Sequence, residues 1–267
     1  MEVDVSSSLR FLENAGKGSE PIVFVHGGGI SSRMWRYALE QLSEFHCLAP
    51  DLPGHGYSRE IRPCPLDLAV EGTLNLIQEK VPSREARIVG TSVGVPVCVS
   101  LSNRYPEHVE ALFLSGPTPR FNPVASWMMN LISRPILSLV GSEGRSKMVG
   151  QMMDLSARQM EEFHEDLAQI TPDLVTEIND LLESQEDPST VNIPAEPFVG
   201  EDENGSTKKR CQQLTTAYGN EDHAVVLDHG HAWPLEAPDL FVDAVKAWAS
   251  GGRPADGFRY VPNFHAA

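Results

Sequence analysis

Short apolar runs alternate with amphipathic segments along the first 117 residues of the chain. The runs are continuous, rich in β-branched residues and closed by glycine or polar residues, as is typical of strands buried on both faces of a parallel sheet. Between them, apolar residues recur at intervals of three or four, which is typical of helices. The expected strands are 21–25, 47–50, 86–90 and 111–114, and the expected helices are 35–45, 66–80 and 95–103. This alternation predicts βαβ units and a mostly parallel sheet.

The pattern changes between residues 118 and 190. Helical spacing dominates this stretch, which also holds six of the eight methionines. The expected helical segments are 121–139, 147–153, 157–170 and 174–183. A group of helices between two strand-bearing stretches indicates an inserted lid.

Strand-like runs return after the expected lid. We expect strands at 193–200 and 224–227 and a final helix at 238–249. The tail, residues 251–267, opens with Gly-Gly-Arg-Pro and is expected to be an extended appendage. The domain organisation that follows is an α/β core made of residues 1–117 and 191–267, interrupted by a helical cap of residues 118–190.

Composition and charge narrow the classes of partner. With 267 residues, 41% of them hydrophobic and 22% charged, the chain is long and apolar enough to fold around a sizeable core. A net charge of −16 repels phosphate backbones and anionic lipids, so we expect neither a nucleic-acid nor a membrane partner. The composition does not indicate an oligomeric state.

Targeting and cysteine patterns point to the cytoplasm. The N-terminus carries acidic residues where a signal peptide has basic ones, and no apolar stretch approaches the ~18 residues of a membrane span. The four cysteines are scattered without CxxC or metal-like spacing, which favours reduced thiols while leaving a disulfide open. We therefore expect a cytoplasmic protein.

The segment Gly-Thr-Ser-Val-Gly, residues 90–94, matches the pattern G-x-S-x-G. An expected strand runs into it and an expected helix leaves it, which is the setting that a nucleophile elbow requires. Side chains two positions before and after Ser92 would collide across such a turn, so Gly90 and Gly94 give room. The helix start behind the serine favours developing negative charge. Ser92 is the predicted nucleophile, and the alternative is an ordinary serine in a glycine-rich turn.

Backbone amides are the expected donors to an oxyanion formed at this serine. One is the N–H of Val93, and the second is expected from the His-Gly-Gly-Gly loop that begins at His26. We favour Gly28, with Gly27 or Gly29 as alternatives, and we expect Gly27 to border the substrate. His26 itself is interpreted as a structural residue at a strand end. The alternative for the loop is a flexible glycine-rich turn.

A general base is expected from the segment Asp-His-Gly-His-Ala, residues 228–232. The base must lie at the same sheet edge as the nucleophile, and parallel strands present their carboxyl ends together. His231 is preferred over His229, because it lies farther from the preceding strand.

The acid that orients this base is expected between the nucleophile and the histidine. The strand ending at Gly200 delivers three carboxylates, of which Glu203 is the first choice, Asp202 the second and Glu201 the third. Any of them can hold the imidazole tautomer, and the others belong to a solvated acidic loop.

These motifs together resemble the α/β-hydrolase superfamily over nearly the whole chain. The matching segments are IVFVHGGG, LAPDLPGHGYS, IVGTSVG, NRYPEHVEALFLSG, IPAEPFVGEDE and HGHAWPLEAPDLF. The resemblance implies an eight-stranded type of sheet, a Ser-His-acid triad and a cap over the site. It places the family's acid position on Glu203, where aspartate is commoner.

The resemblance is strongest to small capped esterases and lactonases. Relatives among the epoxide hydrolases and haloalkane dehalogenases carry aspartate at the nucleophile position, so Ser92 argues against both.

The methionine-rich lid bears on the expected substrate. Flexible methionines can adapt to an acyl chain or an alicyclic ring, although core packing is the simpler role for any one of them. The residues expected to line the pocket are Trp127, Met128 and Met153, with Met129 as a further candidate. Arg120 and Arg134 can meet a carboxylate, but exposed arginine is the simpler interpretation.

The leading hypothesis is hydrolysis of a small apolar ester or lactone through an acyl-Ser92 intermediate. No metal cluster, phosphate loop or G-x-G-x-x-G fingerprint occurs in the sequence, so we expect neither metal nor cofactor. The alternatives are a non-hydrolytic enzyme, either an acyl transferase or a lyase, and a small-molecule receptor with slow turnover.

Overall fold

The computed structural model describes most of the chain between residues 9 and 263. The described residues are 9–14, 16, 18, 20–124, 126, 127, 130, 131, 138, 139, 141–152, 155, 157–189 and 193–263, without the side chains of 145, 149, 150, 152, 158 and 162.

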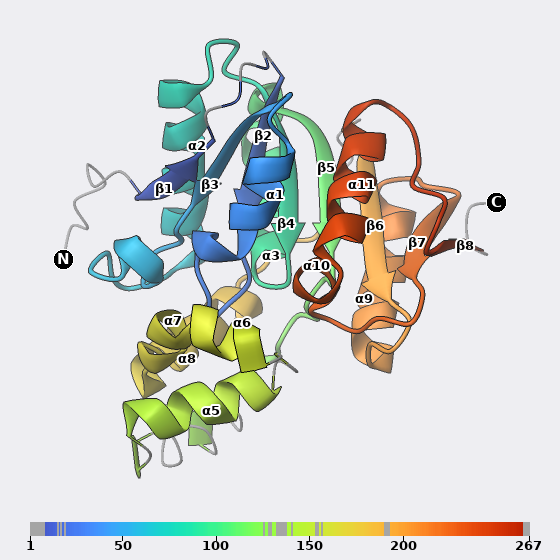
Figure 1. The fold of residues 1–267 in the computed structure, drawn as a ribbon. Helices are drawn as coiled ribbons and strands as arrows, with labels where there is room; N and C mark the ends of the chain where they lie inside the picture. The colour runs from blue at the N-terminus through green and yellow to red at the C-terminus, as the bar shows by residue number, and fades with distance from the viewer. Residues whose placement is uncertain are drawn as a thin grey trace.

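An eight-stranded sheet runs through the molecule in the order β1-β3-β2-β4-β5-β6-β7-β8 (Figure 1). The six inner strands, β3 to β7 in that order, are mutually parallel, and β1 and β8 pair antiparallel at the two edges. The strands are β1 (Phe11–Glu13), β2 (Pro21–Val25), β3 (His46–Pro50), β4 (Ala86–Thr91), β5 (Val109–Ser115), β6 (Ala195–Gly200), β7 (Asp222–Val226) and β8 (Phe258–Pro262). The predicted α/β-hydrolase type of sheet is confirmed.

Helices cover both faces of the sheet. The core helices are α1 (Arg36–Gln41), α2 (Leu66–Lys80), α3 (Gly94–Arg104), α9 (Gly205–Ala217), α10 (Trp233–Glu236) and α11 (Pro238–Ala249), with 3₁₀ turns η1 (Ser32–Trp35), η2 (Gly56–Ser58) and η3 (Pro106–His108). Alternate residues of β2 belong to different apolar clusters: Ile22 and Phe24 pack with α1 and α11, whereas Val23 and Val25 pack with α2 and α3. Burial on both faces explains the continuous apolar runs of the inner strands.

Four helices with defined bounds lie among the described residues between β5 and β6. They are α5 (Ser142–Met152), α6 (Ala157–Glu162), α7 (His164–Ala168) and α8 (Pro172–Glu183). Figure 1 shows them grouped beyond the carboxyl ends of β4 and β5. We call the described residues between 118 and 190 the helical insertion.

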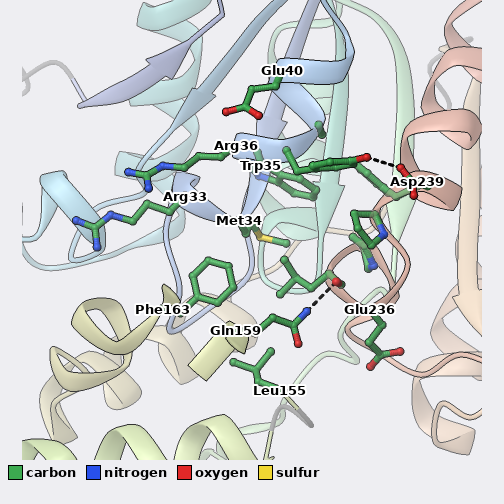
Figure 2. Close-up of a pocket in the computed structure, with 16 residues that line it drawn as sticks. Arg33, Met34, Trp35, Arg36, Glu40, Leu155, Gln159, Phe163, Glu236 and Asp239 are labelled. Atoms are coloured by element: carbon green, nitrogen blue, oxygen red, sulfur yellow. Dashed lines mark hydrogen bonds between the residues drawn. The ribbon is translucent and has the colours of Figure 1, made fainter. Parts of the chain in front are cut away.

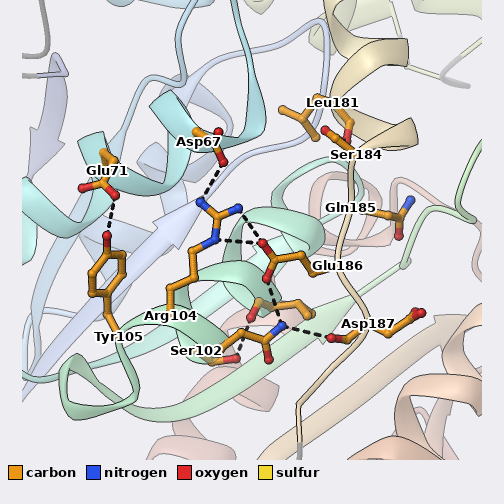
Figure 3. Close-up of polar contacts among 12 residues, drawn as sticks. Asp67, Glu71, Ser102, Arg104, Tyr105, Leu181, Ser184, Gln185, Glu186 and Asp187 are labelled. Carbon is orange, nitrogen blue, oxygen red and sulfur yellow. Dashed lines mark hydrogen bonds and ion pairs between the residues drawn. The ribbon is translucent and has the colours of Figure 1, made fainter.

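Ion pairs hold the two ends of the helical insertion, near Arg120 and near Asp187, against the core. Arg104 of α3 pairs with Glu186 (Figure 3), and Asp187 accepts from Arg210 of α9 at 2.9 Å. The hydrogen bond from Arg210 lowers the pKa of Asp187. Arg120 near the start of the insertion lies 3.5 Å from Asp187 near its end, so this arginine bridges the two ends.

The core elements that were not expected from the sequence include β8, β1 and α9. The tail beyond residue 251 is not an appendage throughout, because β8 pairs with β7 at the edge of the sheet. Strand β1 has only three residues, too few to show a pattern. Helix α9 is largely polar, and its start is set by Asn204, whose side chain accepts from the N–H groups of Ser206 and Thr207.

Other sequence expectations concern cysteines and membranes. All four cysteines are free and buried. Within the described ranges, none of the helices combines the length and the apolar character needed to cross a membrane.

Candidate active site

Ser92 occupies a sharp turn between β4 and α3. Its φ angle is +53°, in the left-handed region that L-residues rarely adopt. A Cβ on Gly90 would collide with the Cys98 sulfur, and one on Gly94 would collide with the Val25 carbonyl. The two glycines therefore let the turn form, and it raises the Ser92 hydroxyl at the carboxyl edge of the sheet.

Three side chains from distant parts of the chain form a hydrogen-bonded line at this edge. The Nε2 of His231 lies 3.0 Å from the Ser92 Oγ, and its Nδ1 lies 2.8 Å from a Glu203 carboxylate oxygen. A carboxylate can only accept, so the Nδ1–H donates to Glu203 and the Nε2 lone pair faces the Ser92 hydroxyl. The Glu203 side chain is 1% exposed and that of His231 47% exposed. The arrangement can deprotonate Ser92 and stabilise the imidazolium that results.

Two glycines make room for the histidine and the glutamate. Gly116, just after β5, has a φ of +55°, and a Cβ there would lie 3.1 Å from the His231 ring and 3.2 Å from a Glu203 oxygen. Gly200, at the end of β6, packs against the carbonyls of the 229–230 segment so closely that a Cβ would collide with them. Sequence reasoning singled out neither glycine for this role. A glycine directly after a strand was the available signal.

The remaining carboxylates and the second histidine have other partners. Glu201 accepts from the Asp228 N–H and from Arg259, and these contacts lower the pKa of Glu201. Asp202 is exposed, and its N–H donates to the His229 carbonyl. The His229 ring lies 3.5 Å from Glu236. Among the three expected acids, the structure brings Glu203 to His231.

The glycine loop after β2 lies against the nucleophile. A Cβ on Gly27 would sit 3.3 Å from the Ser92 Cβ, and one on Gly28 would sit 3.0 Å from the Val93 side chain. Val93 is the N-cap of α3, where backbone N–H groups have no partner within the helix. The structure thus places all three expected residues, Gly27, Gly28 and Val93, beside Ser92.

A buried histidine fixes the orientation of this loop. The Nε2 of His26 accepts from the Leu52 N–H at 2.9 Å, so the proton lies on Nδ1, which donates to the Gly27 carbonyl at 2.7 Å. Burial lowers the pKa of His26 to about 4 and keeps the ring neutral. The Gly27 carbonyl and the Gly28 N–H belong to one planar trans peptide and point in opposite directions. Holding the carbonyl therefore directs the Gly28 N–H away from His26.

The helical insertion covers the outer side of the glycine loop. Cβ atoms on Gly28 and Gly29 would lie 3.4 Å from Ile178 and 3.0 Å from Ile170. The Ser31 hydroxyl donates to Asp166 of α7 at 2.5 Å. Asp166 is 4% exposed, and burial raises its pKa.

A cavity of about 440 Å³ opens onto Ser92 and His231. Its wall includes Gly27, Gly28, Ile30, Met34, Asp202 and Leu235. Thr118, which the sequence did not single out, has its hydroxyl 3.3 Å from the Ser92 Oγ.

The expected lid contacts are placed only in part. Trp127 is 63% exposed, and the described wall of the Ser92 cavity does not include it. Met128, Met129, Met153 and Arg134 lie outside the described residues. Across the described ranges, His, Cys, Asp and Glu side chains form no cluster of three or more that could hold a metal ion.

Comparisons with known proteins identify relatives of the whole chain and of part of it. The sequence profile of the alpha/beta hydrolase family matches residues 22–244. An AB hydrolase superfamily protein of Gibberella zeae is 27% identical over 97% of this chain and 90% of its own length. A pimeloyl-[acyl-carrier protein] methyl ester esterase of Nitrosomonas europaea is 35% identical, but the match spans only 43% of this chain and 44% of that protein.

Solved structures share the fold at low sequence identity. A thermophilic esterase from Thermogutta terrifontis superposes with a TM-score of 0.75 at 20% identity, covering 91% of this chain and 93% of that one. The enol-lactonase from Burkholderia xenovorans gives 0.72 at 18% identity, covering 91% and 96%.

Proposed function

Because the chain belongs to the alpha/beta hydrolase family, we propose that it hydrolyses a carboxylic ester, open-chain or cyclic, through an acyl intermediate on Ser92. The observation that carries this proposal is the line from Ser92 through His231 to Glu203, with contacts of 3.0 and 2.8 Å. The printed names of relatives as esterases and a lactonase support the same bond type.

The reaction proceeds in two halves. His231 Nε2 takes the Ser92 proton while the Oγ bonds to the ester carbon, and the carbonyl oxygen becomes an oxyanion. The N–H groups of Gly28 and Val93 donate to that oxyanion, and each such donor is worth about 3–4 kcal/mol of transition-state stabilisation. The intermediate then collapses, and the leaving alkoxide receives the proton from His231.

Water completes the cycle. His231 removes a proton from a water molecule as its oxygen attacks the acyl carbon. The second oxyanion collapses, Ser92 leaves as the hydroxyl with the proton returned by His231, and the carboxylic acid is released. The helical insertion serves in this proposal as the cap that shields both steps from bulk solvent.

Covalent labelling tests the assignment of Ser92. A fluorophosphonate should add one equivalent to the protein, and peptide mass spectrometry should find it on Ser92. Ser92→Ala should abolish labelling and lower ester turnover by about 10⁶-fold. Ser83→Ala, an exposed serine before β4, should label like the unaltered protein. A folded protein that resists labelling, or a Ser92→Ala variant that keeps its turnover, would exclude the proposal.

Product analysis separates hydrolysis from the other uses of the same residues. With an added alcohol present, a hydrolase should release mainly the acid. An acyl transferase would give mainly the new ester, and a receptor would release one equivalent and stop.

A further inference from the structure

A second cavity, of about 800 Å³, shares part of its wall with the Ser92 cavity. Figure 2 shows the residues that line it. It lies between η1 and α1 on one side and α6 and α10 on the other. The two cavities share four wall residues: Met34, Pro234, Leu235 and Glu236. Met34 follows the glycine loop and Leu235 follows His231, so the shared wall begins at the reacting groups. We call this second cavity the side groove.

The inner wall of the side groove is apolar. It is formed by Met34, Trp35, Leu155, Phe163, Leu235 and Phe241. All except Leu235 are buried, and Leu235 is half-buried. Leu155 and Phe163 come from the helical insertion, so the groove is closed from both the core and the insertion. Such a surface gains free energy by covering apolar groups and offers little to a charged one.

Polar groups on the same wall are already engaged with one another. Tyr37 donates to Asp239, and the Gln159 side chain donates to the Leu235 carbonyl at 2.7 Å. Arg33 pairs with Glu165 at 2.8 Å. These bonds engage the side chains of Tyr37, Gln159 and Arg33 within the protein.

Other polar side chains on the wall of the groove are Arg36, Glu40 and Glu236. The Trp35 Nε1 and the Arg33 Nε lack partners among the described residues, and both atoms are buried. Arg36 and Glu40 are exposed and carry opposite charges one helical turn apart at the outer edge. An occupant would therefore contact apolar side chains inside and reach water beyond α1.

We propose that the side groove binds an extended apolar arm of the ester substrate while the ester carbonyl lies at Ser92. This inference rests on the proposed hydrolysis and narrows the substrate class to esters with a long aliphatic or similarly lipophilic arm. Met34 and Leu235, flexible side chains on the shared wall, admit the arm from one cavity into the other.

Chain-length series on the unaltered protein test the groove directly. One series is the p-nitrophenyl esters from acetate through butyrate and octanoate to dodecanoate, which lengthens the acyl arm. The other is the acetate esters of the matching straight-chain alcohols, whose hydrolysis is monitored by the release of acid. Each buried methylene should raise kcat/KM about three- to fourfold along the series whose arm occupies the groove. A flat profile in both series would overturn the inference.

A substitution that fills the groove tests where the arm lies. Leu155→Trp should lower the ratio of long-arm to short-arm kcat/KM by at least about tenfold in the ester series whose arm occupies the groove, because the indole occupies space that the arm needs. Leu139→Trp is the matched control: the same exchange in the helical insertion at a leucine that is 87% exposed. It should leave the ratio unchanged. Equal ratios in the two variants would place the arm elsewhere.

Alkyl fluorophosphonates separate this inference from the function on which it rests, and they do not depend on a variant that folds. A long-chain reagent should label Ser92 at least about tenfold faster than a methyl one. Failure of every phosphonate to label would remove the proposed function. Labelling at equal rates would leave the function in place and remove the groove.

Discussion

The two sides of Ser92 are held in different ways. On one side, His231 and Glu203 lie on the loops after β7 and β6, with Gly116 packed against both and Gly200 packed against the 229–230 segment. The helical insertion reaches this side through Gln159, which donates to the Leu235 carbonyl at 2.7 Å. Trp233, fully buried beside the loop after β7, donates to the Ser115 hydroxyl at the end of β5 at 2.7 Å.

The glycine loop on the other side depends partly on the helical insertion. Ile170 and Ile178 pack over Gly29 and Gly28, and Asp166 accepts from Ser31, which follows the loop. Its inner anchor is a pair of buried histidines, His26 and His55, whose rings lie 5.1 Å apart.

In the proposed mechanism, this difference predicts that proton transfer and stabilisation of the oxyanion depend on different parts of the fold. Proton transfer by His231 should depend less on the position of the helical insertion, which contacts this side through the Gln159 bond to the Leu235 carbonyl. Stabilisation of the oxyanion by Gly28 should respond to it, because the loop that carries this donor touches the insertion. The following changes test each side in turn.

The largest effect is expected on the histidine side, from Glu203→Gln. The glutamine amide can donate to Nδ1, which favours the imidazole tautomer with the proton on Nε2, where it cannot accept from Ser92. Loss of the tautomer should lower kcat by about 10⁴-fold with little change in KM. Glu201→Gln, an exchange two residues away that breaks only the exposed contacts to Asp228 and Arg259, should cost about twofold or less.

Steady-state kinetics on the two variants decide the assignment. If Glu201→Gln lost activity and Glu203→Gln kept it, then Glu203 would not be the acid that orients His231.

Lowering the pH should destabilise the side of Ser92 that carries the glycine loop. Burial lowers the pKa of His26 to about 4 and that of His55 to about 3, so the folded state favours the neutral rings. Their contribution to stability is complete above the unfolded pKa of about 6.5 and is lost as the pH falls from there towards 4. For His26 the loss amounts to roughly 3 kcal/mol. A protonated His26 would also no longer accept from Leu52.

Urea unfolding at about pH 7.5 and about pH 5 measures this loss. His55→Asn keeps a donor for the Pro53 carbonyl and should make the pH dependence shallower. A free energy of unfolding that stayed constant over this interval in the unaltered protein would show that the buried histidines do not titrate as described.

The sequence was informative where the signal is local. The inner strands follow from continuous apolar runs, because both of their faces are buried. Helix α2 follows from apolar residues at helical intervals, because one of its faces is buried. The pattern around Ser92 predicted the turn, since the sterics of that turn involve residues within a few positions. His231 and Glu203 followed from the rule that parallel strands end at one edge, although three carboxylates competed for one place.

The sequence did not predict features that depend on contacts between distant segments. Helix α9 was missed because its sequence is mostly polar, and β8 because an edge strand buries little. The bond between Ser31 and Asp166 joins residues 135 positions apart, and no spacing rule relates them. The substrate contact expected of Trp127 stays a prediction: its side chain is 63% exposed.

The smallest effect should come from Asp166→Asn, which tests whether the helical insertion holds the glycine loop. Asparagine keeps the size of the side chain but weakens the bond to Ser31 and removes the charge that faces Arg33 at 3.4 Å. A loss of about 1 kcal/mol in the alignment of the Gly28 donor corresponds to about a fivefold decrease in kcat, with KM little changed. Its pH profile should keep the apparent pKa of the unaltered protein, because His231 and Glu203 do not touch this contact.

Glu165→Gln provides the control for that small effect, because Glu165 is the neighbouring residue and pairs with the same arginine. Its side chain is 71% exposed, and such an exposed pair contributes little. A fivefold loss in Asp166→Asn with none in Glu165→Gln would locate the effect in the Ser31 contact and not in the charge of Arg33. Identical kcat values for the two variants would mean that the glycine loop keeps its position without the helical insertion.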